Sequence, residues 1–175
     1  HQSMTLVVGI EHPDKKSVIL ASDSFIGDDE HRDLIDTPKW FRLGKIWFGY
    51  AGIIAIAQVA EHSYKVVQLS PGERQVSYLF RVVQGIYAAC REAGLKPDDG
   101  TFLLAYKGKV YYVTEGGAPV RSAHGYAAIG SGELQALSAL AVTQGVDAEA
   151  RAKAVLEAVS RHCSQVSAPF HVLRI

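Results

Sequence analysis

The sequence predicts a layered sandwich in which two β-sheets lie face to face and pairs of helices cover their outer faces. Apolar, β-branched segments occur in pairs joined by turn residues, which is the pattern of β-hairpins. Segments with apolar residues at helical spacing also occur in pairs, between the predicted strands. Hydrophobic residues make up 48% of the 175-residue chain, which is enough to bury the faces that such layers share.

Three β-hairpins are predicted, each from two apolar runs separated by turn residues. Their strands are expected at 5–10 and 17–21, at 39–43 and 46–51, and at 101–106 and 110–114. Between the first two hairpins, residues 28–33 are mostly acidic and too charged for a core. We expect that segment to be an exposed loop.

Four helices and two further strands complete the predicted elements. Apolar residues at helical spacing predict helices at 53–67, 75–93, 134–142 and 148–163. Short apolar runs predict strands at 126–129 and 170–175. The sequence contains no repeat, linker or low-complexity tract, so residues 5–175 are expected to form one domain.

Composition excludes several classes of function. Eighteen Lys and Arg residues balance eighteen Asp and Glu residues, so the composition gives no indication of a basic surface for nucleic acid. No stretch is long and apolar enough to span a membrane, and no secretory signal is visible. Cys90 and Cys163 have no disulfide framework around them, which favours a cytoplasmic protein. The histidines show no metal-ligand spacing, so we expect neither a metal nor another cofactor.

The first four residues are expected to lie outside the fold. His1, Gln2 and Ser3 look like a tag remnant, and Met4 looks like the initiator methionine. Thr5 then becomes the first residue of the predicted domain, at the head of its first strand.

Five short motifs occur in a fixed order along the chain. They are Thr5–Ile10, Ala21–Ser24, Lys39, Tyr50–Gly52 and Ala128–Gly132. Together they resemble the motifs of proteasome β-type subunits. In length, the chain is more similar to their bacterial relative HslV. The resemblance covers residues 5–175 and includes the spacing between Asp23 and Lys39. It implies an α+β fold, the N-terminal nucleophile (Ntn) hydrolase fold, which is a four-layer αββα sandwich of two antiparallel sheets flanked by helix pairs.

The resemblance also implies a threonine-type endopeptidase with Thr5 as nucleophile and the α-amine of Thr5 as general base. Lys39 would favour the neutral form of that amine and so lower its pKa. Asp23 would pair with Lys39 and keep it charged. The backbone N–H of Gly52 would stabilise the oxyanion that forms during attack.

Further residues are assigned by the same resemblance. Ser131 would hydrogen-bond the amine or a water that carries the proton, and Ser167 would act similarly from further out. Gly27 would offer its backbone to an extended peptide. Tyr50 would shape the first specificity pocket, which we expect to favour cleavage after apolar residues. The chain departs from the family pattern at Ser164, where active proteasome subunits have Asp.

The implied assembly is a self-compartmentalising protease of stacked hexameric or heptameric rings. Its substrates would be peptides or unfolded proteins, and its partner an AAA+ unfoldase. The helix pair within 53–93 offers apolar faces for ring-to-ring packing. Two alternatives remain open: a catalytically inactive structural ring subunit, and an Ntn amidase that acts on small amides. Activity further requires removal of Met4, because the amine of Thr5 must be free.

Overall fold

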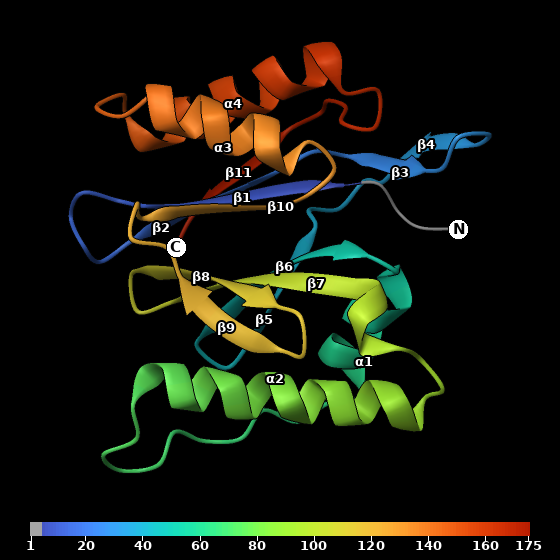
Figure 1. The fold of residues 1–175 in the computed structure, drawn as a ribbon, viewed down its shortest axis with the longest axis vertical. Coiled ribbons are helices and arrows are strands. Elements are labelled where there is room, and N and C mark those ends of the chain that lie inside the picture. The colour runs from blue at the N-terminus through green and yellow to red at the C-terminus, as the bar shows by residue number, and fades with distance from the viewer. Residues whose placement is uncertain (1–4) are drawn as a thin grey trace.

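The computed structural model describes residues 5–175, so the prediction for residues 1–4 lies outside the described part of the chain. Figure 1 shows four stacked layers: a helix pair, two β-sheets and a second helix pair. Within the described residues, all strand pairs of the two layered sheets are antiparallel. The layers and the antiparallel sheets together confirm the predicted α+β sandwich.

The upper sheet has four strands in the order β10-β1-β2-β11. Their bounds are Leu6–Glu11 for β1, Val18–Ser22 for β2, Tyr126–Gly130 for β10 and His171–Arg174 for β11. Residues 6–10 of β1 are all buried, because one face of the strand meets the helices and the other meets the second sheet. This double burial explains why the sequence there is a continuous apolar run without alternation.

The lower sheet has five strands in chain order, β5-β6-β7-β8-β9. Their bounds are Trp40–Leu43, Ile46–Gly52, Gly100–Tyr106, Lys109–Thr114 and Ala118–Arg121, and a short 3₁₀ helix at Pro97–Asp99 precedes β7. The strand β9 was not expected, because its four residues include Pro119 and only two apolar residues besides. An edge strand tolerates proline, since its outer N–H needs no partner in the sheet.

Two helices cover each sheet (Figure 1). They are α1 Ile54–His62 and α2 Gln75–Glu92 on the lower sheet, and α3 Glu133–Val142 and α4 Ala148–His162 on the upper sheet. Most apolar residues of α1 and α2 lie buried against the lower sheet, so only part of these faces is left for the ring packing expected of them. Within residues 5–175, no helix combines the length and the hydrophobicity that a bilayer crossing requires.

The first predicted helix is too long at its C-terminal end. The helix ends at His62, and the apolar residues that follow lie in a segment without regular secondary structure that packs on the core. The phenol of Tyr78 fixes this segment, donating a hydrogen bond to the carbonyl oxygen of Val67 at 2.8 Å. Apolar spacing alone therefore failed here, since tertiary contacts with α2 bury the same side chains without a helix.

The acidic segment at 28–33 is exposed as expected, but it is not wholly a loop. Strands β3 Phe25–Gly27 and β4 Arg32–Leu34 pair as a separate two-stranded sheet that projects beside the upper sheet (Figure 1). Main-chain pairing needs no apolar side chains, so the charges of this segment gave no sign of a strand.

The two sheets are in close contact at Gly49 of β6. A Cβ atom built on Gly49 would lie 2.6 Å from Cγ1 of Val7, a core residue of β1 in the opposite sheet. Glycine is therefore required here by the space between the sheets rather than by its backbone conformation.

Replacing Gly49 with alanine is expected to lower the free energy of unfolding by about 1–3 kcal/mol, because the added methyl group overpacks the contact with Val7. Urea denaturation followed by circular dichroism measures this change. The double variant Gly49→Ala/Val7→Ala is the control: removing the opposing methyl groups should make its loss smaller than the sum of the two single losses. Simple additivity of the two losses would show that the contact is not the cause.

Candidate active site

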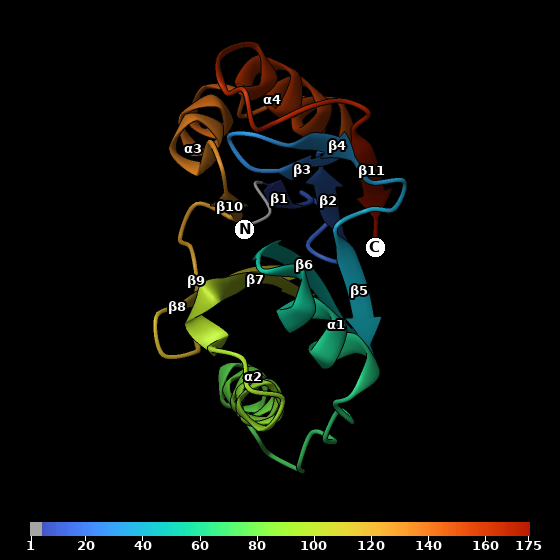
Figure 2. The same ribbon diagram turned by 90° about the vertical axis from the view of Figure 1, so that its right-hand side faces the viewer.

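The predicted residues meet where β1 begins. Because β1 and β2 are antiparallel, with Val7 opposite Ser22, the start of β1 lies beside the end of β2. This pairing places Thr5 next to Asp23, whose backbone N–H donates to the carbonyl oxygen of Leu6 at 3.2 Å. The chain then crosses to the lower sheet through β5 (Figure 2), and Lys39 immediately precedes that strand.

The carboxylate of Asp23 is the centre of the site and is fully buried. Its Oδ1 atom accepts hydrogen bonds from the Thr5 hydroxyl at 3.3 Å, the Leu6 N–H at 3.0 Å and the Lys39 ammonium at 2.8 Å. Its Oδ2 atom accepts from the N–H groups of Phe25 and Ser167, each at 3.1 Å. Both oxygens are thus satisfied, as a buried carboxylate requires.

Lys39 is 2% exposed and therefore carries its charge inside the protein. Burial lowers the pKa of its ammonium group, and the adjacent Asp23 carboxylate opposes that effect. The ammonium also donates to the carbonyl oxygen of Phe25 at 2.5 Å. The Thr5 hydroxyl and the Lys39 ammonium both contact Oδ1 of Asp23, so the two groups lie close together.

Ser131 reaches Thr5 through the main chain. Its N–H donates to the Thr5 carbonyl oxygen at 2.5 Å, and its hydroxyl lies 3.5 Å from Oε1 of Gln165. The preceding residue, Gly130, has a φ of 100°, and a Cβ atom there would lie 2.0 Å from the Thr5 carbonyl oxygen. The glycine is therefore what lets β10 end against Thr5.

Ser167 contributes its backbone as well as its hydroxyl. Its N–H holds Asp23, and its carbonyl oxygen accepts from the Ser24 N–H at 2.9 Å. Its hydroxyl accepts a hydrogen bond from the guanidinium of Arg32 at 2.7 Å. The structure thus brings Ser167 to the carboxylate of Asp23, with its hydroxyl turned to Arg32.

The three remaining predicted residues lie at different distances from this centre. The Tyr50 N–H donates to the Lys39 carbonyl oxygen at 3.1 Å, so β6 is tied to the residue before β5. Gly52 ends β6 with a φ of 91°. Its neighbour Ala51 faces Gly130, because a Cβ atom built on Gly130 would lie 3.3 Å from the Cβ atom of Ala51. Gly27 lies further out in the β3–β4 hairpin, opposite Arg32.

Two residues at the site were missed by sequence reasoning. Phe25 donates its N–H to Asp23 and accepts from Lys39 through its carbonyl oxygen, and Arg32 binds the Ser167 hydroxyl. The main-chain groups of Phe25 leave no mark on the sequence, because every residue except proline carries them. Arg32 stood in a charged segment that was interpreted as a solvated loop.

A cavity of about 550 Å³ lies away from this site, between β8, β10 and α3. Its walls include Tyr112, His124, Tyr126, Glu133 and Leu137. None of the predicted site residues lines it, so its size gives no reason to move the candidate site away from Thr5.

These four layers, with the fully buried β1 in the middle of the molecule, form the Ntn hydrolase fold, which the motifs predicted. Among solved structures, BPH from Thiobacillus denitrificans matches with a TM-score of 0.81 and 17% sequence identity, over 97% of each chain. The same values hold for BPH in complex with epoxomicin.

Eukaryotic HslV from Trypanosoma brucei also matches this chain. Its TM-score is 0.68 at 15% identity, over 97% of this chain and 98% of that chain. No family model matches the sequence, and no curated protein sequence matches it either. The likeness to HslV-like proteins is therefore established at the level of the fold.

Replacing Asp23 with asparagine is expected to lower the free energy of unfolding by about 3–5 kcal/mol at neutral pH, because the Lys39 charge stays buried without its partner. The pKa of Lys39 should also fall further, since Asp23 opposes the effect of burial. Lys39 then binds more protons in the unfolded protein than in the folded one. The loss of unfolding free energy relative to the wild type should therefore shrink as the pH rises toward the pKa of an unfolded Lys, about 10.4. Denaturation between neutral and alkaline pH measures both effects.

The matched control for this prediction is the double variant Asp23→Asn/Lys39→Met. It removes the buried charge, so it should be more stable than Asp23→Asn alone at neutral pH and should lose the alkaline recovery. A single variant as stable as the wild type would contradict a charged pair at this position.

Proposed function

We propose that this chain is a threonine-type peptidase subunit that hydrolyses peptide bonds with Thr5 as its nucleophile. The observation that carries the proposal is the shared oxygen of Asp23, which binds both the Thr5 hydroxyl and the Lys39 ammonium. A hydroxyl, a carboxylate and a cation gathered at the head of a buried strand form a nucleophile, an orienting group and an electrostatic aid.

The reaction requires a free amine on Thr5. An α-amine has a reference pKa of about 7.7–8.0, so a useful fraction is neutral near pH 7 and can accept the hydroxyl proton. The Thr5 oxygen then attacks the peptide carbonyl carbon, and the oxyanion is stabilised by the Gly52 N–H. The amine returns the proton to the leaving nitrogen, which leaves an ester on Thr5. Water, activated by the same amine, hydrolyses the ester and releases the acid.

Lys39 and Asp23 prepare the amine for this task. The Lys39 ammonium disfavours a second positive charge nearby, which lowers the pKa of the amine and increases its neutral fraction. Asp23 keeps that ammonium charged despite its burial, since it opposes the desolvation that lowers the pKa of Lys39. Ser131 is positioned by its N–H bond to the Thr5 carbonyl oxygen, and its hydroxyl is proposed to bind the amine or the proton-carrying water.

The substrate is proposed to be an extended peptide that adds to the outer edge of β3 at Gly27. Tyr50 borders the first specificity pocket. Its half-buried ring lies 6.2 Å from that of Phe41, measured between ring centres, which makes an apolar and aromatic wall. Cleavage after apolar residues follows from that wall.

Self-association into stacked rings, together with an AAA+ unfoldase that supplies unfolded substrates, completes the proposal. Support for association comes from α3 and the turn after it, where Leu134 is 71%, Val142 83% and Val146 49% exposed. Large apolar side chains that are exposed on a helix are better accommodated at an interface than in water. The unpaired thiols of Cys90 and Cys163 fit a reducing cytoplasm.

A chain that starts at Thr5 is expected to hydrolyse peptide–coumarin substrates, whereas the chain with residues 1–4 attached should not. The reason is that the peptide bond after Met4 converts the amine into an amide, which is no base. Fluorescence release measures the difference. The variant Thr5→Ala in the shortened chain is the control and should be inactive, and equal activity in the long and short chains would contradict the mechanism.

An epoxyketone separates this proposal from its alternatives. The reagent class of epoxomicin, which is bound by BPH in one solved structure, offers one electrophile to a hydroxyl and another to an amine of the same residue. Mass spectrometry of the shortened chain should show a stable adduct on Thr5. An inactive ring subunit would show none, and a small-amide amidase would act as a monomer or dimer in native mass measurements.

A further inference from the structure

The Oδ2 atom of Asp23 is held by two N–H groups from distant parts of the chain. Phe25 begins β3, two residues after Asp23, whereas Ser167 lies in the segment after α4. A carboxylate is planar, so whatever holds Oδ2 also sets the direction of Oδ1. That second oxygen carries the Thr5 hydroxyl and the Lys39 ammonium. The placement of both reacting groups therefore depends on how firmly Phe25 and Ser167 are held.

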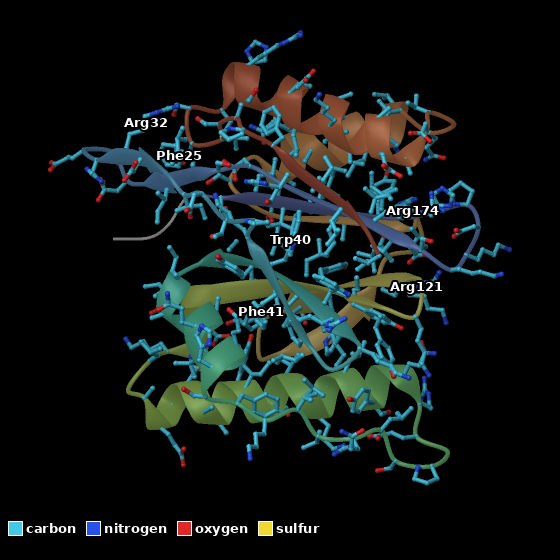
Figure 3. All side chains as sticks on the ribbon, turned by 180° about the vertical axis from the view of Figure 1, so that it is seen from behind. Phe25, Arg32, Trp40, Phe41, Arg121 and Arg174 are labelled. Atoms are coloured by element: carbon cyan, nitrogen blue, oxygen red, sulfur yellow. The ribbon has the colours of Figure 1, made fainter. Side chains whose placement is uncertain are left out.

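One side chain contacts both of these residues. The guanidinium of Arg32 donates to the Ser167 hydroxyl at 2.7 Å. The same group lies over the ring of Phe25, with its central carbon 5.4 Å from the ring centre. Figure 3 shows Arg32 beside Phe25 at the end of the molecule where β3 and β4 project. Cation–π stacking and a charge-assisted hydrogen bond both fix a guanidinium in direction as well as distance.

From this geometry we infer that Arg32 is a positioning residue for the Asp23 carboxylate. It spans Phe25 and Ser167 from outside and holds their N–H groups on Oδ2, which keeps Oδ1 aimed at Thr5 and Lys39. The inference rests on the proposed function of Thr5. Arg32 itself takes no part in bond making, because its contacts are with Ser167 and Phe25 and it acts through them.

A simpler role for Arg32 is to stabilise the β3–β4 hairpin alone. Arg32 lies directly opposite Gly27 in that hairpin, and Gly27 is where the substrate backbone is proposed to bind. Loss of hairpin structure would therefore weaken substrate binding and raise KM. Loss of carboxylate positioning would instead lower kcat, so the two roles are separated by which kinetic constant changes.

The test uses the Thr5-starting chain with Arg32→Met, which keeps an apolar stem over Phe25 but removes the donor to Ser167. We expect kcat to fall about tenfold with KM nearly unchanged, because small displacements of reacting groups are costly. The acid limb of the kcat–pH profile should move to higher pH, since a loosely held Lys39 lowers the pKa of the amine less. Arg32→Lys, which can still donate to the Ser167 hydroxyl, should recover part of kcat.

Two further variants control this test. The guanidinium of Arg42 on β5 lies 5.7 Å from the ring centre of Trp47 on β6. Arg42→Met therefore removes an exposed stacked arginine away from the site residues, and this variant should keep wild-type kinetics. Ser167→Ala removes only the acceptor and should reproduce the loss seen in Arg32→Met. The double variant Arg32→Met/Ser167→Ala should be no slower than Arg32→Met, because the hydrogen bond lost in Ser167→Ala is already lost in Arg32→Met.

Each outcome decides the inference. Wild-type kcat and pH profile in Arg32→Met, a change in KM alone, or losses that multiply in the double variant would each overturn the role of Arg32 and leave the peptidase intact. A shortened wild-type chain with neither turnover nor an epoxyketone adduct would overturn the proposed function, and this inference with it. If thermal unfolding shows that Arg32→Met does not fold, Ser167→Ala carries the same kinetic test.

Discussion

The buried ion pair between Asp23 and Lys39 is the interaction on which the candidate site depends. Two charges can stay inside a protein only when nearly every oxygen and proton finds a partner. Here the partners come from the start of β1, the start of β3 and the segment after α4. The need to satisfy one carboxylate thus draws together parts of the chain that are up to 144 residues apart in sequence.

The surrounding layers make that arrangement rigid. Strand β1 is buried on both faces, so Thr5 at its head is placed by the packing of two sheets and a helix pair rather than by a surface loop. Gly49 and Gly130 allow this packing, because a side chain at either position would collide with β1 or with Thr5 itself. A hydroxyl on such a support is preorganised, as the proposed proton transfer over short distances requires.

The resemblance to BPH and HslV in fold at 15–17% identity has a physical explanation. A sandwich needs apolar residues in strands and on one side of each helix, and many sequences supply them equally well. The same tolerance explains two of the errors in the predicted elements. Tyr64, Val66 and Val67 have helical spacing but pack on the core from a segment that is neither helix nor strand, and Arg32–Leu34 is mostly charged but still pairs as a strand.

Most strands and helices, although not β3, β4 and β9, could be predicted from the sequence by itself. The family resemblance singled out Thr5, Asp23 and Lys39, because their side chains are chemically distinctive and the spacing of Asp23 and Lys39 matches. Only the tertiary structure placed Phe25 and Ser167 on the Asp23 carboxylate, and Arg32 on Ser167. Their contributions are main-chain N–H groups and a single hydrogen bond across the fold. Every residue except proline carries such an N–H, so its direction, and hence its role, exists only once distant segments have packed together.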